Sequence, residues 1–337
     1  MKNSHILLNH GSGGKLSRKL VSDIFFKYFD NDMLNSGTDS AIVEVPPELL
    51  AFTTDSFVVD PLFFPGWDIG KLAVCGTVND LAVSGAEPKY LSTGFIIEEG
   101  FPLNDLEKIV KSMAETANSC NVKIVTGDTK VVNRGQCDKL FINTSGIGLL
   151  NKKYKNISSG IDIKPGDKII VNGTIADHGI SVMAARNELN VSADVISDCA
   201  PLNQMISEVL GNGSIKFMRD ATRGGLATVL AELKEGRNWG LEIYESKIKI
   251  RENVRGMCEF FGFDPLYIAN EGKVVIVVDQ NSAKEILKTI KKNKFGKDAS
   301  IIGEVVESNP GKTILKTKIG GRRMIDMLSG DQLPRIC

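Results

Sequence analysis

Five aspartates in similar surroundings are candidates for binding a metal ion. Each lies at the expected edge of a strand or helix, beside small residues that leave room for a ligand: Asp39 in GTDSAIVEV, Asp55 in TTDSF, Asp80 in TVNDLAVSGA, Asp128 in VTGDTK and Asp220 in RDATRGGLA. A single Asp in such a position often only caps a helix or closes an Asx-turn. The repetition favours a hard cation such as Mg²⁺, which takes one or two carboxylates together with nucleotide phosphate oxygens.

The Gly-rich segment HGSGGK, residues 10–15, is a candidate phosphate site. Its backbone N–H groups and Lys15 would meet the anion at the start of the following helix. The segment lacks the spacing of a P-loop and follows no strand, so neither that motif nor a Rossmann fingerprint applies. A flexible N-terminal turn remains the alternative interpretation.

Glu271 and Lys130 are candidates for proton transfer. Glu271, in ANEGKVV, precedes an apolar strand, and loops in that position often carry catalytic acids and bases. Lys130 follows a turn in GDTKVV, where a solvated surface charge is the simpler interpretation. His178, in ADHG, is expected to belong to a turn.

The chain ends on Cys337, within the segment LPRIC. A thiol at a chain end is chemically reactive, so either its position is accidental or the tail exists to carry it. The cysteines in apolar or helical segments are expected to fill the core: Cys75, Cys120, Cys199 and Cys258. The sequence contains no CxxC pair, which indicates a reducing cytoplasm rather than a disulfide framework.

The overall composition is that of an ordinary globular protein. Lys and Arg together number 41, as do Asp and Glu, so the formal net charge is zero. This balance argues against nucleic acid or an anionic membrane as the main partner, because both select a basic surface. No apolar run in the sequence approaches the roughly 18–20 residues of a membrane-spanning helix.

Strand and helix patterns alternate along the chain, which predicts an α/β (α+β) protein. In the first half we expect helices at 15–29, 70–86 and 103–117, and strands at 41–45, 49–59, 90–98, 122–128 and 140–150. In the second half we expect strands at 167–173, 215–220, 273–279 and 300–306, and helices at 181–189, 202–210, 225–236 and 282–293. A polar, turn-rich stretch at 151–166 marks the boundary between two domains.

In their order along the chain, these motifs resemble the HypE family of hydrogenase maturation proteins. That family belongs to the superfamily of aminoimidazole ribonucleotide synthetase and selenophosphate synthetase. The most specific segments are HGSGGK, TTDSFVVDPLFFPGWDIGKLAVCGTVNDLAVSGAEP, FIIEEGFP, VTGDTKVV, RDATRGGLA, DPLYIANEG and the ending LPRIC. The resemblance covers essentially the whole chain.

The resemblance implies a two-domain aminoimidazole ribonucleotide synthetase-like fold with mixed sheets covered by helices. It also implies a homodimer in which the N-terminal domains pair and ATP binds near their interface. The parts expected are a Gly-rich flap and helix at 1–36, an ATP-binding and dimerisation domain at 37–152, a synthetase-like domain at 160–320, and a mobile tail at 321–337 that carries the reactive Cys.

The resemblance further implies roles for individual residues. Asp55 and Asp80 correspond to ligands of magnesium and ATP, and their helpers would be Asp39, Asp128 and Asp220. The flap over the phosphates would consist of Gly11, Gly13, Gly14 and Lys15. Lys71, in IGKLAV, is a plausible further phosphate contact.

The reaction of the family gives the tail a purpose. A partner carbamoyltransferase, HypF, places a carbamoyl group on the C-terminal thiol, here Cys337. ATP then drives dehydration of the thiocarboxamide to a thiocyanate, and a HypC–HypD scaffold receives the cyanide on iron, toward a [NiFe] hydrogenase. Phosphorylation of the amide oxygen makes phosphate the leaving group. A base must then remove protons from nitrogen, and we expect Glu271 in that role, with Lys130 relaying the proton or polarising the amide oxygen.

Two other functions stay open at this point. A synthetase of the same superfamily could phosphorylate a free small-molecule amide or a selenide, and would not need the tail. Selenophosphate synthetases carry Cys or selenocysteine in the N-terminal Gly-rich loop, whereas this chain has Ser12, which argues against selenium chemistry. A nucleotide-sensing scaffold without chemistry is the remaining alternative.

Overall fold

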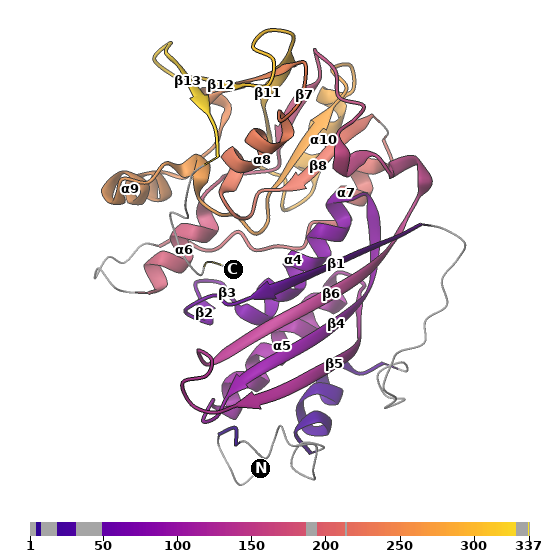
Figure 1. The fold of residues 1–337 in the computed structure, drawn as a ribbon, viewed down its shortest axis with the longest axis vertical. Helices are drawn as coiled ribbons and strands as arrows, with labels where there is room; N and C mark the ends of the chain where they lie inside the picture. Colours follow the sequence, from indigo (N-terminus) through magenta and orange to yellow (C-terminus); the bar gives the residue numbers. More distant parts are fainter. Residues whose placement is uncertain are drawn as a thin grey trace.

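The computed structural model describes residues 5–7, 19–31, 49–186, 194–212, 214–327 and 336, and the structural statements below concern these residues. They form two α/β units stacked along the long axis of the molecule (Figure 1). The N-terminal unit ends with β6 (Leu140–Leu150) and the C-terminal unit begins with β7 (Lys168–Val171). The connection contains two short 3-10 helices, η3 (Lys152–Tyr154) and η4 (Ile157–Ser159).

A four-stranded mixed sheet forms the N-terminal unit, in the order β1-β6-β4-β5. Its other strands are β1 (Leu49–Phe57), β4 (Ala86–Glu98) and β5 (Lys123–Val132). Only β4 and β5 are parallel neighbours. Parallel neighbours need a crossover connection, and α5 (Leu103–Ser119) supplies it. The helix predicted at 103–117 is confirmed, and Leu106, Val110 and Met113 on one side of it are fully buried.

Helix α4 (Ile69–Val83) lies at the centre of the molecule and is buried on nearly all sides. It contacts β1, β4, β6 and α5 of its own unit, and α7 and β8 of the C-terminal unit. The side chain of Asp68 caps the helix by accepting from the N–H groups of Gly70 at 2.7 Å and Lys71 at 3.1 Å. A short hairpin of β2 (Phe63–Phe64) and β3 (Trp67–Asp68) precedes it.

Among the described residues, no helix covers one face of the N-terminal sheet. In Figure 1 the four strands lie in front and α4 and α5 lie behind them. The uncovered face carries large apolar side chains, and Phe52 is 71% exposed, Leu50 49% and Ile96 43%. Exposed apolar side chains in this number on one sheet face are typical of an interaction surface.

The C-terminal unit contains a seven-stranded sheet in the order β13-β12-β9-β11-β7-β10-β8. Beside β7, its strands are β8 (Ile215–Asp220), β9 (Gly240–Tyr244), β10 (Val274–Val278), β11 (Ser300–Val306), β12 (Thr313–Lys316) and β13 (Arg322–Ile325). Its helices are α6 (Asp177–Ala185), α7 (Asn203–Leu210), α8 (Gly225–Leu233), α9 (Glu252–Phe261) and α10 (Ala283–Lys292), with 3-10 helices η5 (Glu245–Lys247) and η6 (Pro265–Tyr267). Apolar clusters cover both faces of the sheet, one with α8 and one with α7 and α10, so every residue of β10 is buried.

Most predicted elements are confirmed within a few residues, but the start of the expected tail needs correction and several short elements were not predicted. The expected tail does not begin at residue 321, because Arg322–Ile325 pairs with β12 as strand β13 and Ile325 is buried. Gly320 has a φ of 88° and lies in the hairpin turn between these strands. The Gly-rich sequence around it predicted a mobile tail instead of a hairpin. Strands β9 and β12 and helix α9 were not predicted.

The N-terminal helix expected at 15–29 is only partly within the described residues. There it consists of a π-helix, η2 (Val21–Phe26), followed by α2 (Lys27–Phe29). Ile24, Phe25 and Phe29 pack into the N-terminal core. The strand expected at 41–45 lies outside the described residues. None of the helices in the described ranges combines the length and apolar character needed to span a bilayer.

Candidate active site

Four acidic side chains approach one another where the two units meet. Asp55 comes from the middle of β1, Asp80 from the C-terminal part of α4, and Asp220 from the end of β8. Glu271 lies in the loop between η6 and β10. Helix α4 contacts both β1 and β8, and this packing brings the carboxylates of the two units together.

Burial raises the pKa of all three aspartates, and neighbouring carboxylates raise those of Asp80 and Asp220 further. Burial raises the pKa of Asp80 to about 6, Thr53 opposes this by donating to Oδ2 at 2.9 Å, and nearby Asp55 adds to it. Burial, and then the charges of Asp80 and Asp55, raise the pKa of Asp220 to about 7. Burial also raises the pKa of Asp55, with Arg223 opposing. A cation at this cluster would stabilise the ionised carboxylates.

The carboxylate cluster of Asp55, Asp80 and Asp220 fits a cation whose coordination other oxygens complete. Among the described residues, no three His, Cys, Asp or Glu side chains lie close enough to hold a metal ion by themselves. Mg²⁺ usually takes only one or two protein carboxylates and fills its remaining positions with water and phosphate oxygens. The donor set therefore suits a magnesium–phosphate pair better than a metal enclosed by protein alone.

Glu271 is a buried carboxyl group with an open hydrogen-bonding position. Its side chain is 3% exposed, and Oε1 has no hydrogen-bond partner among the described residues. Its backbone is fixed, because its N–H donates to Asp198 Oδ1 at 3.1 Å and its carbonyl accepts from Asn79 at 3.3 Å. Burial, followed by the neighbouring Cys199 and Asp220, raises the pKa of Glu271 well above its usual value. A buried polar atom without a partner is rare and commonly marks a functional site.

Two buried thiols lie next to Glu271. Cys75 in α4 and Cys199 are 0% and 1% exposed, as predicted for core residues. Burial, and then Cys75, raise the pKa of Cys199 well above that of a free thiol. A buried thiol whose pKa is raised is a poor nucleophile, so we expect Cys199 to line the site without reacting.

Lys71 does not lie beside the carboxylate cluster. Burial lowers the pKa of Lys71, whereas Cys75, Cys199 and Asp68 raise it. Its ammonium lies over the ring of Trp67. Lys71, the predicted phosphate contact, therefore lies near the two thiols and not beside the carboxylate cluster.

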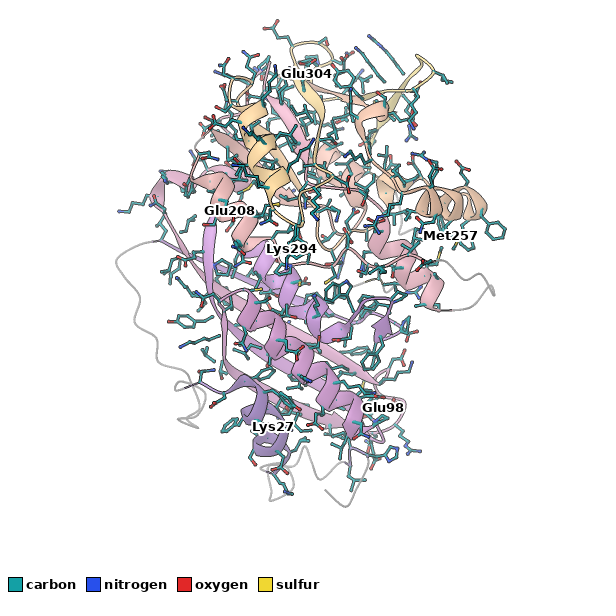
Figure 2. The ribbon with its side chains drawn as sticks, turned by 180° about the vertical axis from the view of Figure 1, so that it is seen from behind. Lys27, Glu98, Glu208, Met257, Lys294 and Glu304 are labelled. Atoms are coloured by element: carbon teal, nitrogen blue, oxygen red, sulfur yellow. The ribbon has the colours of Figure 1, made fainter. Side chains whose placement is uncertain are left out.

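A basic cavity of about 310 Å³ adjoins Cys199. Its basic lining residues are Arg251, Lys273, Lys294 and Lys297. Lys273 is paired with Asp198 at 2.8 Å, and both side chains are at least nine-tenths buried. Figure 2 shows Lys294 at the junction of the two units. Cys199 thus lines the basic cavity and also lies near the carboxyl group of Glu271.

Asp128 and Lys130 lie elsewhere within one chain. Both are on β5, where they form a surface ion pair of 3.7 Å and are 72% and 67% exposed. Two strands separate β5 from β1, so this pair lies roughly 14 Å from Asp55 across the sheet. Lys130 therefore does not lie beside Glu271 within one chain. This arrangement could not be predicted, because the sequence gives no information on strand order.

Ile336, one residue before Cys337, is buried in the core of the N-terminal unit. Ile336 is 5% exposed and belongs to the same apolar cluster as Phe64, Val182 and Cys199. Its carbonyl accepts a hydrogen bond from His178 Nε2 at 2.9 Å. His178 was expected in a turn, but it lies fully buried in the first turn of α6. The role of this residue and of its neighbours Ser197 and Asp198 could not be predicted, because no local sequence pattern distinguishes them.

Six predicted site residues lie outside the described residues: Gly11, Gly13, Gly14, Lys15, Asp39 and Cys337.

Comparison with known proteins assigns both units. Residues 37–150 match the family described as AIR synthase related protein, N-terminal domain, and residues 164–316 match the corresponding C-terminal domain. Carbamoyl dehydratase HypE of Rhizobium leguminosarum bv. viciae is 45% identical over 342 residues, which cover 99% of this chain and 96% of that protein. Carbamoyl dehydratase HypE of Escherichia coli (strain K12) is 45% identical over 340 residues, covering 99% of this chain and 100% of that protein.

Solved structures support the same family assignment. The crystal structure of hydrogenase maturation protein HypE in complex with ATP has a TM-score of 0.93 and 45% identity, and the match covers 98% of this chain and 99% of that chain. The crystal structure of a HypE-HypF complex matches with a TM-score of 0.79 and 49% identity, over 92% of this chain and 99% of that chain. The expected fold is confirmed, and the chain belongs to the HypE family of carbamoyl dehydratases among the AIR synthase related proteins.

Proposed function

We propose that this protein is an ATP-dependent carbamoyl dehydratase of hydrogenase maturation whose substrate is a carbamoyl group on its own Cys337. The observation that carries the proposal is the docked end of the tail. Ile336 is buried and accepts from His178, which is linked through Ser197 to the backbone N–H of Cys199. Cys199 in turn lies near Glu271, a buried carboxyl group with an oxygen that has no hydrogen-bond partner among the described residues.

ATP would bind with its phosphates toward Asp55, Asp80 and Asp220. These carboxylates would hold Mg²⁺ together with phosphate oxygens, and the ion supplies positive charge for phosphoryl transfer when bound. A relative of 45% identity has been crystallised in complex with ATP, which supports nucleotide binding here. The segment of Gly11, Gly13, Gly14 and Lys15 would cover the phosphates, with Asp39 and Asp128 as further helpers.

The chemistry proceeds in two steps. The amide oxygen of the thiocarboxamide attacks the γ-phosphorus of ATP, the bond from that phosphorus to the bridging oxygen breaks so that ADP leaves, and nitrogen releases one proton to solvent. The carbon–oxygen bond then breaks with phosphate as leaving group, while Glu271 accepts the second proton from nitrogen and the carbon–nitrogen triple bond forms. A carboxylate in an environment that raises its pKa is a strong base once ionised, which suits this role.

A homodimer would explain two features of the N-terminal unit. The open sheet face carries Phe52, Leu50 and Ile96, which a second copy would cover. Lys130, which is distant from Glu271 within one chain, would act as proton relay only when a second subunit supplies it.

The proposed partners follow the order of the reaction. A carbamoyltransferase of the HypF kind would load Cys337, and a related HypE has been crystallised as a HypE-HypF complex. A HypC–HypD scaffold would receive the cyanide on iron. The described cysteines are free thiols, which is compatible with the cytoplasm as the expected compartment.

Release of ADP in the presence of HypF and a carbamoyl donor tests the function. We expect release above background for the unsubstituted chain and for Cys137→Ala, which removes a half-exposed thiol elsewhere. Release should fall to background for Cys337→Ala, although this variant still binds ATP. Undiminished turnover of a free amide or selenide after deletion of the tail would instead support the small-molecule synthetase.

A further inference from the structure

Both ring nitrogens of the buried His178 have specific partners. Nε2 lies 2.9 Å from the carbonyl oxygen of Ile336, and Nδ1 lies 2.8 Å from Ser197 Oγ. The ring of Phe64 packs edge-to-face against the imidazole at 5.5 Å. The imidazole therefore has one orientation, and that orientation is complementary to the backbone of the tail.

The partners also define which nitrogen carries the proton. A carbonyl oxygen only accepts, so Nε2–H must donate to Ile336. In the neutral ring Nδ1 then accepts from the hydroxyl of Ser197, whose oxygen in turn accepts from the N–H of Cys199 at 3.1 Å. Burial lowers the pKa of His178, although Asp198 opposes this, and the neutral ring is the form that this chain of hydrogen bonds requires.

The serine in this hydrogen-bond chain is anchored through its own backbone. The backbone N–H of Ser197 donates to the carbonyl of Pro65 at 3.2 Å, and its carbonyl accepts from Trp67 Nε1 at 2.9 Å. The hairpin of β2 and β3 thus fixes the serine that orients His178.

The start of α6 is tied to the loop that carries Glu271. Ala176 precedes the helix with a φ of 73°, a conformation that an alanine adopts only under constraint. Its N–H donates to Asn270 Oδ1 at 2.8 Å, and the N–H of Gly179 donates to the carbonyl of Ala269 at 3.1 Å. His178 and Glu271 are therefore held in a common frame.

We propose that His178 is a positioning residue for dehydration. Its hydrogen bond to the carbonyl of Ile336 holds the thiol of the next residue at the site. The inference rests on the proposed function, since it specifies how that function places its substrate. Cys337 follows Ile336 by one Cα step of about 3.8 Å, so docking Ile336 restricts the position of the thiol strongly. A single hydrogen bond and one apolar side chain form a reversible contact, which lets the tail leave for its partners.

Substitution of His178 tests the grip through two readouts. In His178→Ala, alkylation of Cys337 by iodoacetamide should be about tenfold faster, and single-turnover dehydration of a preloaded tail at saturating ATP about tenfold slower. His178→Gln keeps an amide N–H near the position of Nε2 and should recover most of both rates. The KM for ATP should not change, because the residue acts only on the tail.

Ser181→Ala is a matched control on the same helix. Ser181 is fully buried one turn further along α6, and its hydroxyl has no hydrogen-bond partner among the described residues. This variant should behave like the unsubstituted protein in both assays. Alkylation and dehydration rates in His178→Ala that stay within about twofold of the unsubstituted protein would overturn the inference.

A second measurement leaves His178 intact. The chain contains three histidines, so the imidazole ¹⁵N–¹H NMR spectrum is simple enough to follow one ring. In a protein truncated after Arg335, the Nε2–H signal of His178 should shift and exchange faster with water. An unchanged signal would refute the contact. Failure of Cys337 to gain a carbamoyl adduct would instead refute the proposed function and leave this result intact.

Discussion

At the active site, carboxyl groups are buried close together at a cost to folding. Asp80 and Asp220 have pKa values of about 6 and 7, so at pH 8 the fold must hold charges that the unfolded chain carries more easily. Such a site is stable only because the surrounding structure compensates, and a bound cation would relieve it. Function and stability thus oppose each other at single residues.

Asp80→Asn should stabilise the metal-free protein at pH 8 by about 1–3 kcal/mol, while it lowers activity strongly. The folded pKa of about 6 exceeds the unfolded value of 3.8, so the charged form costs stability that is fully expressed above pH 6. As pH falls from 6 toward 4, the folded carboxyl is already protonated and the gain should shrink. Urea unfolding at pH 8 and pH 5 measures this, and an equal gain at both pH values would contradict it.

Glu271→Gln should lower the rate of dehydration about 10²–10⁴-fold without preventing carbamoylation of the tail. The amide has the same shape but cannot accept a proton. In the unsubstituted protein the rate should rise with pH, because burial raises the pKa of Glu271 and the base must be ionised. Single-turnover kinetics on a preloaded tail provide the measurement, and an undiminished rate would exclude Glu271 as the base.

At this scale the sequence indicated residue types more reliably than partners. Asp55, Asp80 and Asp220 were predicted together as metal ligands and Glu271 separately as a base, and the structure brings the four side chains near one another. His178 could not be predicted, because its role depends on contacts with Ile336 and Ser197, which are 158 and 19 residues away. The pairing of Lys130 with Glu271 stays a prediction that requires a second subunit, because Lys130 lies on β5, three strand positions from β1.

At the scale of elements, α4 positions the site because it touches both units. Its composition of Gly, Ala and Val correctly predicted a closely packed helix. Gly70 shows how close the packing is, since a Cβ there would lie 2.4 Å from the carbonyl oxygen of Ile109 in α5. Strand order, the edge strand β13 and the short strand β12 beside it were beyond prediction, because short strands form only where a neighbour pairs with them.

Gly70→Ala should therefore destabilise the protein by about 1–3 kcal/mol, since the added methyl group forces α4 and α5 apart. Gly256→Ala is the matched control, because Gly256 lies in α9 and a Cβ there meets nothing within 4 Å. That variant should gain about 0.5–1 kcal/mol from helix propensity. Equal effects of the two substitutions on the free energy of unfolding would contradict the packing argument.

At the scale of the whole molecule, the site lies between two units and one sheet face stays uncovered. The alternation of strands and helices was sufficient to predict two α/β units, but not that one open face would gather Phe52, Leu50 and Ile96. A second copy on that face would bury these side chains and bring the β5 strands of two chains into the same assembly.

Phe52→Asp should weaken the dimer at least about 100-fold, because it removes apolar burial from both copies and places charge in the interface. Phe260→Asp is the control, since Phe260 is 70% exposed on α9, as Phe52 is 71% exposed on β1. Light scattering across a dilution series measures the association. A dimer that survives Phe52→Asp, or dissociates equally in Phe260→Asp, would place the interface elsewhere.

The most direct test of the account is the mass of the C-terminal peptide. The protein is incubated with carbamoyl donor and HypF, then divided into samples with and without Mg²⁺ and ATP. We predict that the peptide ending in Cys337 first gains the mass of one carbamoyl group. It then loses the mass of one water only in the sample that contains Mg²⁺ and ATP. A carbamoyl group found on another cysteine, or a loaded tail that ATP leaves unchanged, would contradict the account.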